Sequence, residues 1–438
     1  MKLELVIPDV IAKSERLPRL AYLLASVLAL LLLRRAKDST IPRENALGVF
    51  AALVPTELPH KLMALNAAAI YFALKKQLPL LDSWTGSAGA VLHGVALAKL
   101  VRMYHTNVEA KAEIREGMMR LSDIPNEKLW RIGEMTPTRW LSVLLPLPQP
   151  MALALSFPGV SKVRTVTYAH VGLLKTTRLK MDVYKHRDTK PYAPILLYIH
   201  GGGWVIGNRR LPPLPLVYQV ASLGWIVCSI DYRLSPMVAF PSHLIDSKRA
   251  LAVRGCVDTY GVHDFTDRNG IYWHRDHGEN FVKYIELLVM QKKLRNHRDE
   301  FEAASPIVLL DADRDARRET VVPPFLISHG VWDTLVPIKD SRLFYDQLVK
   351  HRERTKYRMV GGVRDVFLPI ESAHHMFNYL VSPRTLAHGD AVCAFLDNLY
   401  AKTKHLPRST RRIAEPNAAA QGVMAWDYRM TAAVSSKL

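Results

Sequence analysis

Short, nearly uninterrupted apolar runs alternate with amphipathic stretches through the second half of this chain. The runs are residues 194–200 (PILLYIH), 224–232 (GWIVCSIDY) and 324–329 (PFLISH). Runs of this kind are typical of strands that are buried on both faces of a sheet. Because such a sheet must be covered by helices on both sides, this feature restricts the chain to a small set of α/β architectures.

Amphipathic helices are predicted between and after these strands, and a β-hairpin is predicted before them. Residues 163–168 (VRTVTY) and 178–184 (RLKMDVY) alternate apolar and polar side chains on either side of a polar loop. The apolar helix faces contain Leu244, Ile245, Leu251 and Ala252; Leu343, Phe344 and Leu348; and Val392, Phe395, Leu396 and Leu399. The pattern predicts an α/β domain at residues 163–403, with a mostly parallel sheet flanked by helices.

The segments outside this domain have a different character. Residues 1–150 carry apolar stretches at 20–33, 46–54, 61–74 and 88–101. The first is shorter than the roughly 20 residues that cross a bilayer. We therefore expect membrane-associated helices with one short or tilted span; a soluble helical cap is the alternative. A linker is predicted at residues 151–162, within a proline-rich stretch, and a basic, disordered tail at 404–438.

The composition favours a membrane surface over a nucleic acid as a partner. The formal net charge is +19, but no zinc-finger spacing, basic region with heptads or RNA-binding signature accompanies it. The three cysteines are far apart and lack CxxC spacing, so no disulfide framework is predicted. Residues 274–279 (HRDHGE) are predicted to be a solvated loop rather than a metal site. No phosphate loop or dinucleotide fingerprint is present, so no cofactor is expected.

The sharpest motif is HGGGW, from His200 to Trp204, directly after a predicted buried strand. Gly201, Gly202 and Gly203 carry no side chains, so their backbone N–H groups can approach a ligand closely. Backbone donors of this kind stabilise an oxyanion. An ordinary glycine turn is the alternative, but the preceding strand and the flanking residues favour an oxyanion hole.

Several motifs together resemble the hormone-sensitive-lipase-like branch of the α/β-hydrolases. They are HGGGW (200–204), DYRLSP (231–236), FPSHLIDSKRAL (240–251), YGVHDFTDR (260–268), ASPI (304–307), HGVWDTLVP (329–337) and HHMFNYLVSPR (374–384). The resemblance covers about residues 160–403. It implies an α/β-hydrolase fold and a carboxylesterase or lipase activity. The apolar N-terminal region loosely resembles that of membrane-associated esterases of the same branch.

The resemblance assigns roles to two further residues. Asp333 stands where the family has the acid of its catalytic triad, which orients the histidine. His375 stands two residues before Phe377, at the offset of the family's catalytic histidine. His374 is the neighbouring alternative.

The resemblance also implies a nucleophilic serine in a G-x-S-x-G turn, and this chain has none. Ser87 (WTGSAGA) has a glycine only at the second position after it, and it precedes the HGGGW strand, whereas the family's serine follows that strand. A turn before a helix is the better interpretation of Ser87. Ser222 (VASLG) also has a glycine only on one side, and lies at a predicted helix end.

The family places this turn between the motifs that here end at Leu251 and begin at Tyr260. Only AVRGCVDT separates them. A strand, a turn and a helix cannot fit into this stretch, so one central strand and its crossover helix are predicted to be missing. The two strands beside the gap must then re-pair or stay open. Cys256, Val257 and the residues near Tyr260 could form a short substitute strand.

Two functions follow from these patterns. The first is a carboxylic ester hydrolase acting on an acyl ester or lipid-like small molecule, with Gly201–Gly203, Asp333 and His375 as its site. The second is a non-catalytic relative that binds an acyl ligand or a membrane partner. Both predict association with a membrane.

Overall fold

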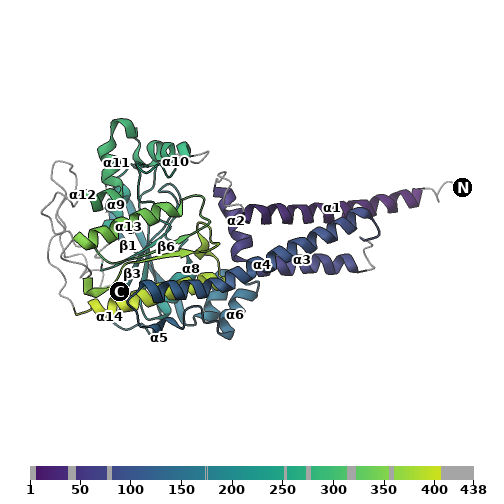
Figure 1. Ribbon diagram of the computed structural model, residues 1–438, viewed down its shortest axis with the longest axis horizontal. Coiled ribbons are helices and arrows are strands. Elements are labelled where there is room, and N and C mark those ends of the chain that lie inside the picture. Colours follow the sequence, from purple (N-terminus) through teal and green to yellow (C-terminus); the bar gives the residue numbers. More distant parts are fainter. Residues whose placement is uncertain are drawn as a thin grey trace.

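A computed structural model describes residues 6–37, 46–75, 81–172, 174, 176–250, 254–272, 278–312, 322–354 and 360–405. The chain forms a globular body from which a bundle of long helices projects (Figure 1). The basic tail predicted at 404–438 lies almost wholly outside the described residues, as do residues 274–277 of the predicted solvated loop. The last two residues of that loop, Gly278 and Glu279, begin a helix instead.

The first sheet contains β1 (Val160–Val171), β2 (Thr177–His186), β3 (Ile195–Ile199) and β4 (Ile226–Ile230). Its order is β1-β2-β4-β3, with β3 and β4 parallel and the other pairs antiparallel. The predicted hairpin and two of the predicted strands are therefore confirmed, but only β4 is buried: no residue of β3 is buried, contrary to the prediction, because β3 is the open edge of this sheet. Alternation in β1 and β2 places Tyr168, Leu179 and Met181 in a small core beneath this sheet.

The second sheet contains β5 (Cys256–Thr259), β6 (Phe325–Gly330) and β7 (Val366–Ile370), all parallel. β6 is the third predicted buried strand. β5 is the short substitute strand that the sequence allowed near Cys256, and it pairs with β6 from Cys256 to Thr259. Sequence reasoning did not identify β7, whose five residues include Pro369.

The two sheets are separate: in the part of the chain that the structure describes, no ladder joins β3 to β5. Each is the last strand of its own sheet. Ile195 and Ile199 at the two ends of β3 are 51% and 42% exposed, whereas Val227 of the neighbouring β4 is fully buried. The gap lies where the sequence predicts the missing strand, and the edges have stayed open rather than re-paired.

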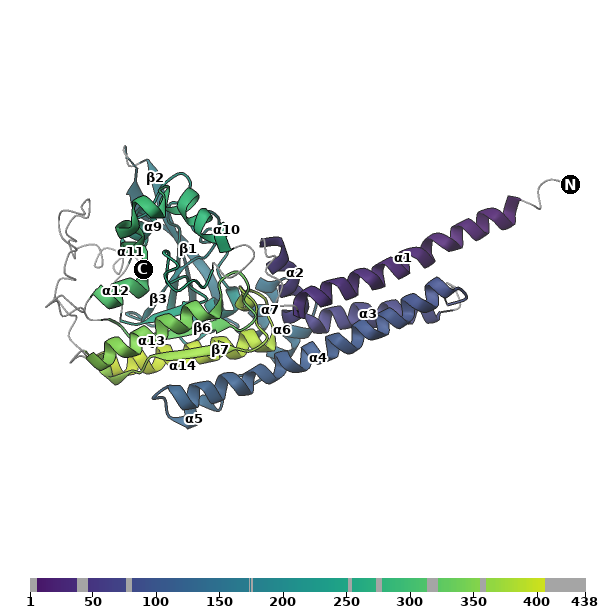
Figure 2. The same cartoon turned by 45° about the horizontal axis from the view of Figure 1, so that its top comes forward.

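Helices hold the two sheets together. α8 (Leu214–Ser222) and α14 (Pro383–Thr403) pack against one another so closely that a Cβ on Gly389 would overlap Gln219. Their buried faces share one core with β4, β6 and β7, and this core includes Val220, Leu326 and Phe395. On the other face of the second sheet, Phe344 and Leu348 of α13 (Ile338–Arg354) pack against Ile327. Figure 2 shows α13 and α14 along the second sheet.

The remaining helices of the body surround these layers. They are α5 (Asn126–Leu129), α6 (Pro137–Leu144), α7 (Gln149–Ser156), α9 (Ser242–Lys248), α10 (Gly278–Tyr284), α11 (Arg298–Ala304) and α12 (Pro306–Ala312), with short π or 3-10 turns at Ile285–Met290, Leu294–Asn296, Val360–Gly362 and Phe377–Tyr379. α9 ends at Lys248, and residues 251–253 after it lie outside the described residues.

Two predicted boundaries differ from the structure. Residues 151–162 were expected to be a linker, but α7 occupies residues 149–156 and buries Leu153 completely in the main core. The prolines begin this helix instead of preventing it, because a proline is tolerated in the first turn. The predicted domain boundary near residue 150 is also wrong, because residues on both sides of it pack in one core.

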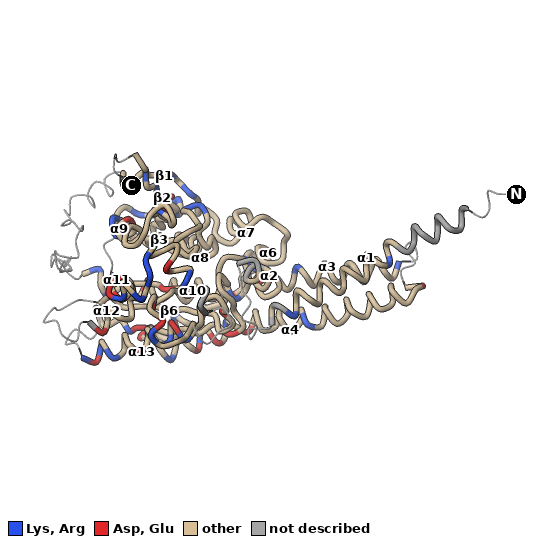
Figure 3. The backbone as a smooth tube through the Cα atoms, turned by 90° about the horizontal axis from the view of Figure 1, so that it is seen from above, with Lys and Arg blue, Asp and Glu red and all other residues tan. Residues whose placement is uncertain are grey.

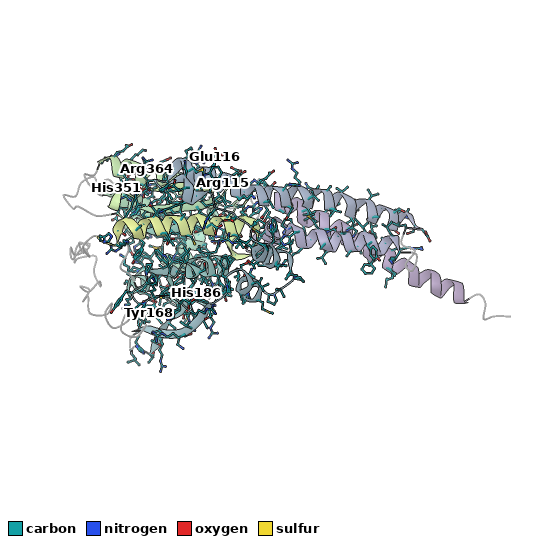
Figure 4. The ribbon with its side chains drawn as sticks, turned by 90° about the horizontal axis from the view of Figure 1, so that it is seen from below. Arg115, Glu116, Tyr168, His186, His351 and Arg364 are labelled. Carbon is teal, nitrogen blue, oxygen red and sulfur yellow. The ribbon has the colours of Figure 1, made fainter. Side chains whose placement is uncertain are left out.

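That core includes the second half of α4 (Trp84–Leu121), which belongs to the body. Ile114 and Met118 are buried in the main core, and a Cβ on Gly117 would overlap Leu368 of β7. Figure 4 places Arg115 and Glu116 of this half in the same region as Arg364, just before β7. The first half of α4 leaves the body and joins the projecting bundle.

The bundle consists of α1 (Val6–Lys37), α3 (Pro59–Leu74) and the first half of α4, with α2 (Ala46–Glu57) at its base (Figures 1 and 2). The apolar stretches predicted as helices are thus confirmed as helices. One of them, Leu17–Arg34 of α1, is long and apolar enough to cross a membrane and is mostly exposed.

Candidate active site

Asp333 and His375 meet in the loops that follow β6 and β7. His375 Nδ1 lies 2.7 Å from Asp333 Oδ2, and the Asp333 carboxylate is completely buried. The two strands are parallel neighbours, so their carboxyl ends lie at the same edge of the sheet. The pair predicted from the resemblance is therefore brought together by the fold.

The surroundings of Asp333 hold the carboxylate in its ionised form. Its Oδ1 accepts hydrogen bonds from the backbone N–H groups of Leu335 and Val336. Its Oδ2 also lies 3.1 Å from Nε2 of His329, which is itself fully buried. Burial opposes ionisation, but the imidazoles of His375 and His329 outweigh it and hold the pKa of Asp333 well below its ordinary value.

The alternative histidine, His374, faces away from Asp333. Its Nε2 lies 2.9 Å from the carbonyl oxygen of Ala36 at the end of α1, and its ring contacts Trp332. Burial lowers the pKa of His374, so its ring is neutral and donates this hydrogen bond. His374 therefore joins the loop after β7 to the base of the bundle, and His375 is the residue paired with the carboxylate.

The HGGGW motif forms a tight turn after β3. Gly202 and Gly203 have φ values of 118° and 59°, and a Cβ on Gly202 would lie 2.1 Å from the carbonyl oxygen of Ile206. Only glycine fits this backbone. All three glycines are exposed to solvent. The predicted oxyanion-hole residues thus lie on an accessible loop at the carboxyl end of a strand.

The flanking His200 and Trp204 hold this turn in place. His200 Nδ1 lies 2.7 Å from the carbonyl oxygen of Gly201, and its ring stacks on Tyr232 at 4.3 Å between centroids. Trp204 packs edge-on against Phe265. The two aromatic contacts explain why the glycine turn needs these particular neighbours.

Tyrosine side chains connect the glycine turn to the histidine loop across the gap between the sheets. The hydroxyl of Tyr198, next to the end of β3, lies 3.2 Å from the hydroxyl of Tyr379, just beyond His375. Tyr284 donates a hydrogen bond of 2.7 Å to the carbonyl oxygen of Gly203. Burial raises the pKa of all three phenols, so they are neutral hydrogen-bond donors.

Tyr260 lies directly against the candidate general base. Its ring centroid is 4.4 Å from that of His375, and its hydroxyl donates to Asn378 Oδ1 at 2.7 Å. The φ of Tyr260 is 49°, a left-handed value that is uncommon for a bulky residue. Tyr260, the residue that follows β5, therefore lies directly beside the imidazole of His375.

Neither partial serine motif reaches this site. Ser87 lies in the first turn of α4, at the far end of the bundle, and its hydroxyl donates to the carbonyl oxygen of Leu81. Ser222 ends α8 and donates to Gln219. In the described ranges, no serine hydroxyl forms a hydrogen bond with His375. The same ranges contain no cluster of three or more potential metal ligands.

Sequence reasoning missed three residues that shape the site. His329 and Tyr260 lie within family motifs, but nothing in the local pattern shows that their rings reach Asp333 or His375. Gln149, at the end of the region predicted as membrane-associated helices, donates a 2.8 Å hydrogen bond to the carbonyl oxygen of Tyr379. These contacts join segments that are distant in the sequence, so no spacing rule could have revealed them.

Comparisons with known proteins find similarity to esterases. The BD-FAE family model matches residues 181–254 and 246–348, and the two matched segments overlap at residues 246–254. Three Mycobacterium tuberculosis proteins are similar: esterase LipC is 28% identical over 273 residues, esterase LipQ 24% over 290, and the probable carboxylic ester hydrolase LipM 28% over 277. These alignments cover 50%, 54% and 51% of this chain.

The chain spans about three fifths of the length of these relatives: 62%, 63% and 59%. Among solved structures, a bacterial heroin esterase is 20% identical with a TM-score of 0.39, covering 68% of this chain and 99% of its own. A fungal esterase from Rhizomucor miehei is 16% identical with a TM-score of 0.45, covering 68% and 97%. Over about half of its length, the chain is therefore similar to proteins named as esterases.

Proposed function

We propose that this chain binds carboxylic esters at the Asp333–His375 pair and hydrolyses them there. The observation that carries the proposal is the 2.7 Å contact between His375 Nδ1 and a fully buried carboxylate. This contact orients the imidazole with its second nitrogen, Nε2, away from Asp333 and available as a base. The glycine turn at 201–203 supplies candidate donors for the carbonyl oxygen of the ester.

The reaction needs a nucleophile, and water is the one that does not require a serine. His375 removes a proton from water as the oxygen attacks the ester carbonyl, giving a tetrahedral oxyanion beside the glycine turn. The protonated His375 then gives its proton to the departing alkoxide, and an acid and an alcohol are released. In serine hydrolases, binding and the oxyanion hole alone retain about 10³–10⁴-fold acceleration after a triad member is removed.

The test is hydrolysis of p-nitrophenyl butyrate by the purified full chain, with parallel exposure to a fluorophosphonate probe. We expect slow turnover without probe labelling, and loss of that turnover in the His375→Gln variant. Ser87→Ala is the control and should leave the rate unchanged, since Ser87 lies on the bundle. Equal rates in the wild type and His375→Gln would refute hydrolysis at this site, and stoichiometric labelling would instead reveal a reactive serine.

One observation favours a second candidate, a non-catalytic relative that binds an acyl ligand. The Tyr260 ring packs against the imidazole of His375, with 4.4 Å between the ring centroids, and therefore takes up space beside the candidate base. This candidate predicts that a medium-chain fatty acid raises the midpoint of thermal unfolding, while ester turnover stays at the rate of His375→Gln. Absence of both stabilisation and turnover would exclude both candidates.

We also propose that the protein is associated with a membrane through α1. The support is the apolar segment Leu17–Arg34, which is mostly exposed in the fold. Co-flotation of the full chain with phospholipid vesicles, resistant to alkaline carbonate, is the expected result. Release by carbonate would contradict insertion.

A further inference from the structure

We propose that the surface of an anionic phospholipid bilayer lies against α6 and α7, and that α1, α3 and the first half of α4 enter the bilayer together. This proposal extends the membrane association proposed for α1 and does not depend on ester hydrolysis. It rests on the distribution of apolar and polar side chains in the bundle, on its charges, and on the position of α6 and α7 at its base.

The bundle exposes apolar side chains on all three helices. Its exposed large apolar residues are Leu17, Leu20, Leu24, Val27, Leu28, Leu31 and Leu32 on α1; Leu65, Tyr71, Phe72 and Leu74 on α3; and Trp84, Val91, Val95 and Val101 on α4. A water-soluble protein rarely exposes so large a contiguous apolar surface. About half of these exposed apolar residues lie on α3 and α4. Insertion of α1 alone would therefore leave the apolar residues of α3 and α4 in contact with water.

Three aromatic or polar side chains from the three helices meet in the interior of the bundle. His93 Nδ1 of α4 is 2.8 Å from Asn66 Oδ1 of α3, and both side chains are buried. Tyr22 of α1 packs on the ring of His93 at 4.8 Å between centroids. Polar side chains that face one another inside, with apolar ones outside, are typical of helices that meet in a membrane.

Charged residues are concentrated at the two ends of the bundle, as Figure 3 shows. Arg34, Lys61, Lys99 and Arg102 lie at the base, one or two on each helix. From Leu17 to the end of α1, throughout α3, and in α4 before Glu109, there is no aspartate or glutamate. A basic collar around an apolar bundle fits the headgroups of anionic lipids.

The apolar length of the bundle is slightly less than the thickness of the hydrocarbon core of a bilayer. The 18-residue apolar segment of α1 is about 27 Å long and the 16 residues of α3 about 24 Å, at 1.5 Å per residue. The hydrocarbon core of a bilayer is about 30 Å thick. The base of the bundle, and the part of the body around it, must therefore lie within the headgroup region.

α6 and α7 occupy that part of the body. In Figures 2 and 3 they lie with α2 at the margin from which the bundle projects. His60 Nε2, in the first turn of α3, is 2.9 Å from the carbonyl oxygen of Val143 in α6. A bidentate ion pair between Arg139 and Asp390 of α14 holds α6 to the body.

The two helices continue the apolar surface of the bundle. The exposed apolar residues of α6, of α7 and of the four residues between them include Leu141, Leu144, Leu145, Met151 and Leu155. Val143 and Leu153, on their other sides, are fully buried. Because the lipid-facing bundle and this patch meet at His60 and Val143, one bilayer surface covers both. A second copy of the chain would not explain the basic collar.

The experiment places a fluorophore on this patch in the full-length chain. Leu144→Cys is labelled with bimane, and Leu309→Cys on α12 is the control, because the two leucines are 53% and 54% exposed. Cys228 and Cys393 are buried. Unsubstituted protein treated with bimane is a second control, which measures any labelling of the native cysteines. Each protein is mixed with phosphatidylglycerol-containing vesicles, with and without brominated acyl chains.

We expect a blue shift at position 144 and loss of its emission in brominated vesicles, with neither change at position 309. An unchanged label at 144 on protein that floats with the vesicles would overturn the proposal and leave membrane contact to the bundle alone. Failure of the protein to float would refute membrane association itself. If the emission change at position 144 depended on protein concentration and not on lipid, a second copy of the chain would cover α6 and α7. That result would also overturn the proposal.

Discussion

At the scale of single residues, His263 shows how strongly one buried group can depend on its neighbours. Its Nε2 lies 3.0 Å from Asp258 Oδ2, its Nδ1 lies 3.2 Å from Asp340 Oδ2, and its ring stacks on Phe344. Burial favours the neutral ring, but the two carboxylates outweigh it and raise the pKa of His263 to about 10. The imidazolium of His263 therefore links Asp258 of β5 to Asp340 in the first turn of α13 through two charged hydrogen bonds.

This raised pKa predicts an alkaline loss of stability. An unfolded histidine has a pKa of about 6.5, so the stabilisation by His263 is complete below that pH and is lost as pH rises through about 10. We expect the free energy of unfolding to fall over this window, at a rate of up to about 1.4 kcal/mol per pH unit. Urea unfolding in detergent at several pH values should show a flatter dependence for His263→Gln, whereas His105→Gln, on an exposed part of α4, should keep the wild-type slope.

Sequence reasoning predicted only those site residues to which the family resemblance assigns a role. Asp333 and His375 match the family's catalytic acid and histidine, so the resemblance implied both positions. The contacts of Tyr260 and His329 with this pair depend on how β5, β6 and β7 stack. Such contacts follow from tertiary packing, which local patterns do not contain.

At the scale of the elements, small residues in α4 determine how the bundle packs. A Cβ on Gly89 would lie 2.7 Å from Cδ1 of Tyr22 in α1, so the two helices approach closely there. Gly89 belongs to the WTGSAGA stretch that contains Ser87. What resembles half of a nucleophile turn is thus a helix start whose small residues admit a neighbouring helix.

Two glycines of α4 offer a matched test of this close approach. Gly89→Leu forces the leucine into the Tyr22 ring, and we expect destabilisation of about 1–3 kcal/mol from overpacking. Gly94→Leu meets no atom within 4 Å of its Cβ and should be neutral or stabilising by up to about 1 kcal/mol. Thermal unfolding in detergent, followed by circular dichroism, distinguishes them; equal midpoints would mean that α1 does not pack on α4 through Gly89.

Most elements could be predicted because their periodicity is strong. β3, β4 and β6 are nearly pure apolar runs, and the helix faces of α13 and α14 repeat cleanly. β7 was missed because five residues with an internal proline give little signal. α7 was mistaken for a linker because its prolines resemble a break, whereas its helix is stabilised by burying Leu153 in the core.

At the scale of the whole molecule, a buried ionic network joins the N-terminal helices to the body. Glu57 at the end of α2 accepts a 2.5 Å hydrogen bond from Arg384 of α14 and a 2.7 Å hydrogen bond from Ser382. Asn107 of α4 reaches Glu57 and also accepts from the backbone N–H of Arg384. All four side chains are buried, so α2, α4 and α14 form one rigid junction next to the histidine loop.

Removing only one charge of this network should lower the stability of the fold strongly. Glu57→Gln leaves the Arg384 charge buried without a counter-ion, and we expect a loss of about 3–5 kcal/mol in the free energy of unfolding. The double variant Glu57→Leu/Arg384→Met removes both charges and should recover most of that loss. Glu300→Gln, which breaks the exposed pair with Lys292, should cost about 1 kcal/mol or less. A double variant as unstable as the single one would show that the charge is not the cause.

The division into two sheets affects how precisely the glycine turn is positioned relative to Asp333 and His375. The glycine turn is carried by one sheet, whereas Asp333 and His375 are carried by the other, and in the described chain no strand ladder spans the gap. Catalytic groups must keep their mutual positions to within about 0.5 Å to be effective. Here the relative position of the two sets of residues depends on the packing of α8 against α14, on the contact of Trp204 with Phe265, and on the contact between the phenols of Tyr198 and Tyr379. If the glycine turn and His375 act together as proposed, we expect fluctuation of these side-chain contacts to limit the rate acceleration more than the strength of the base.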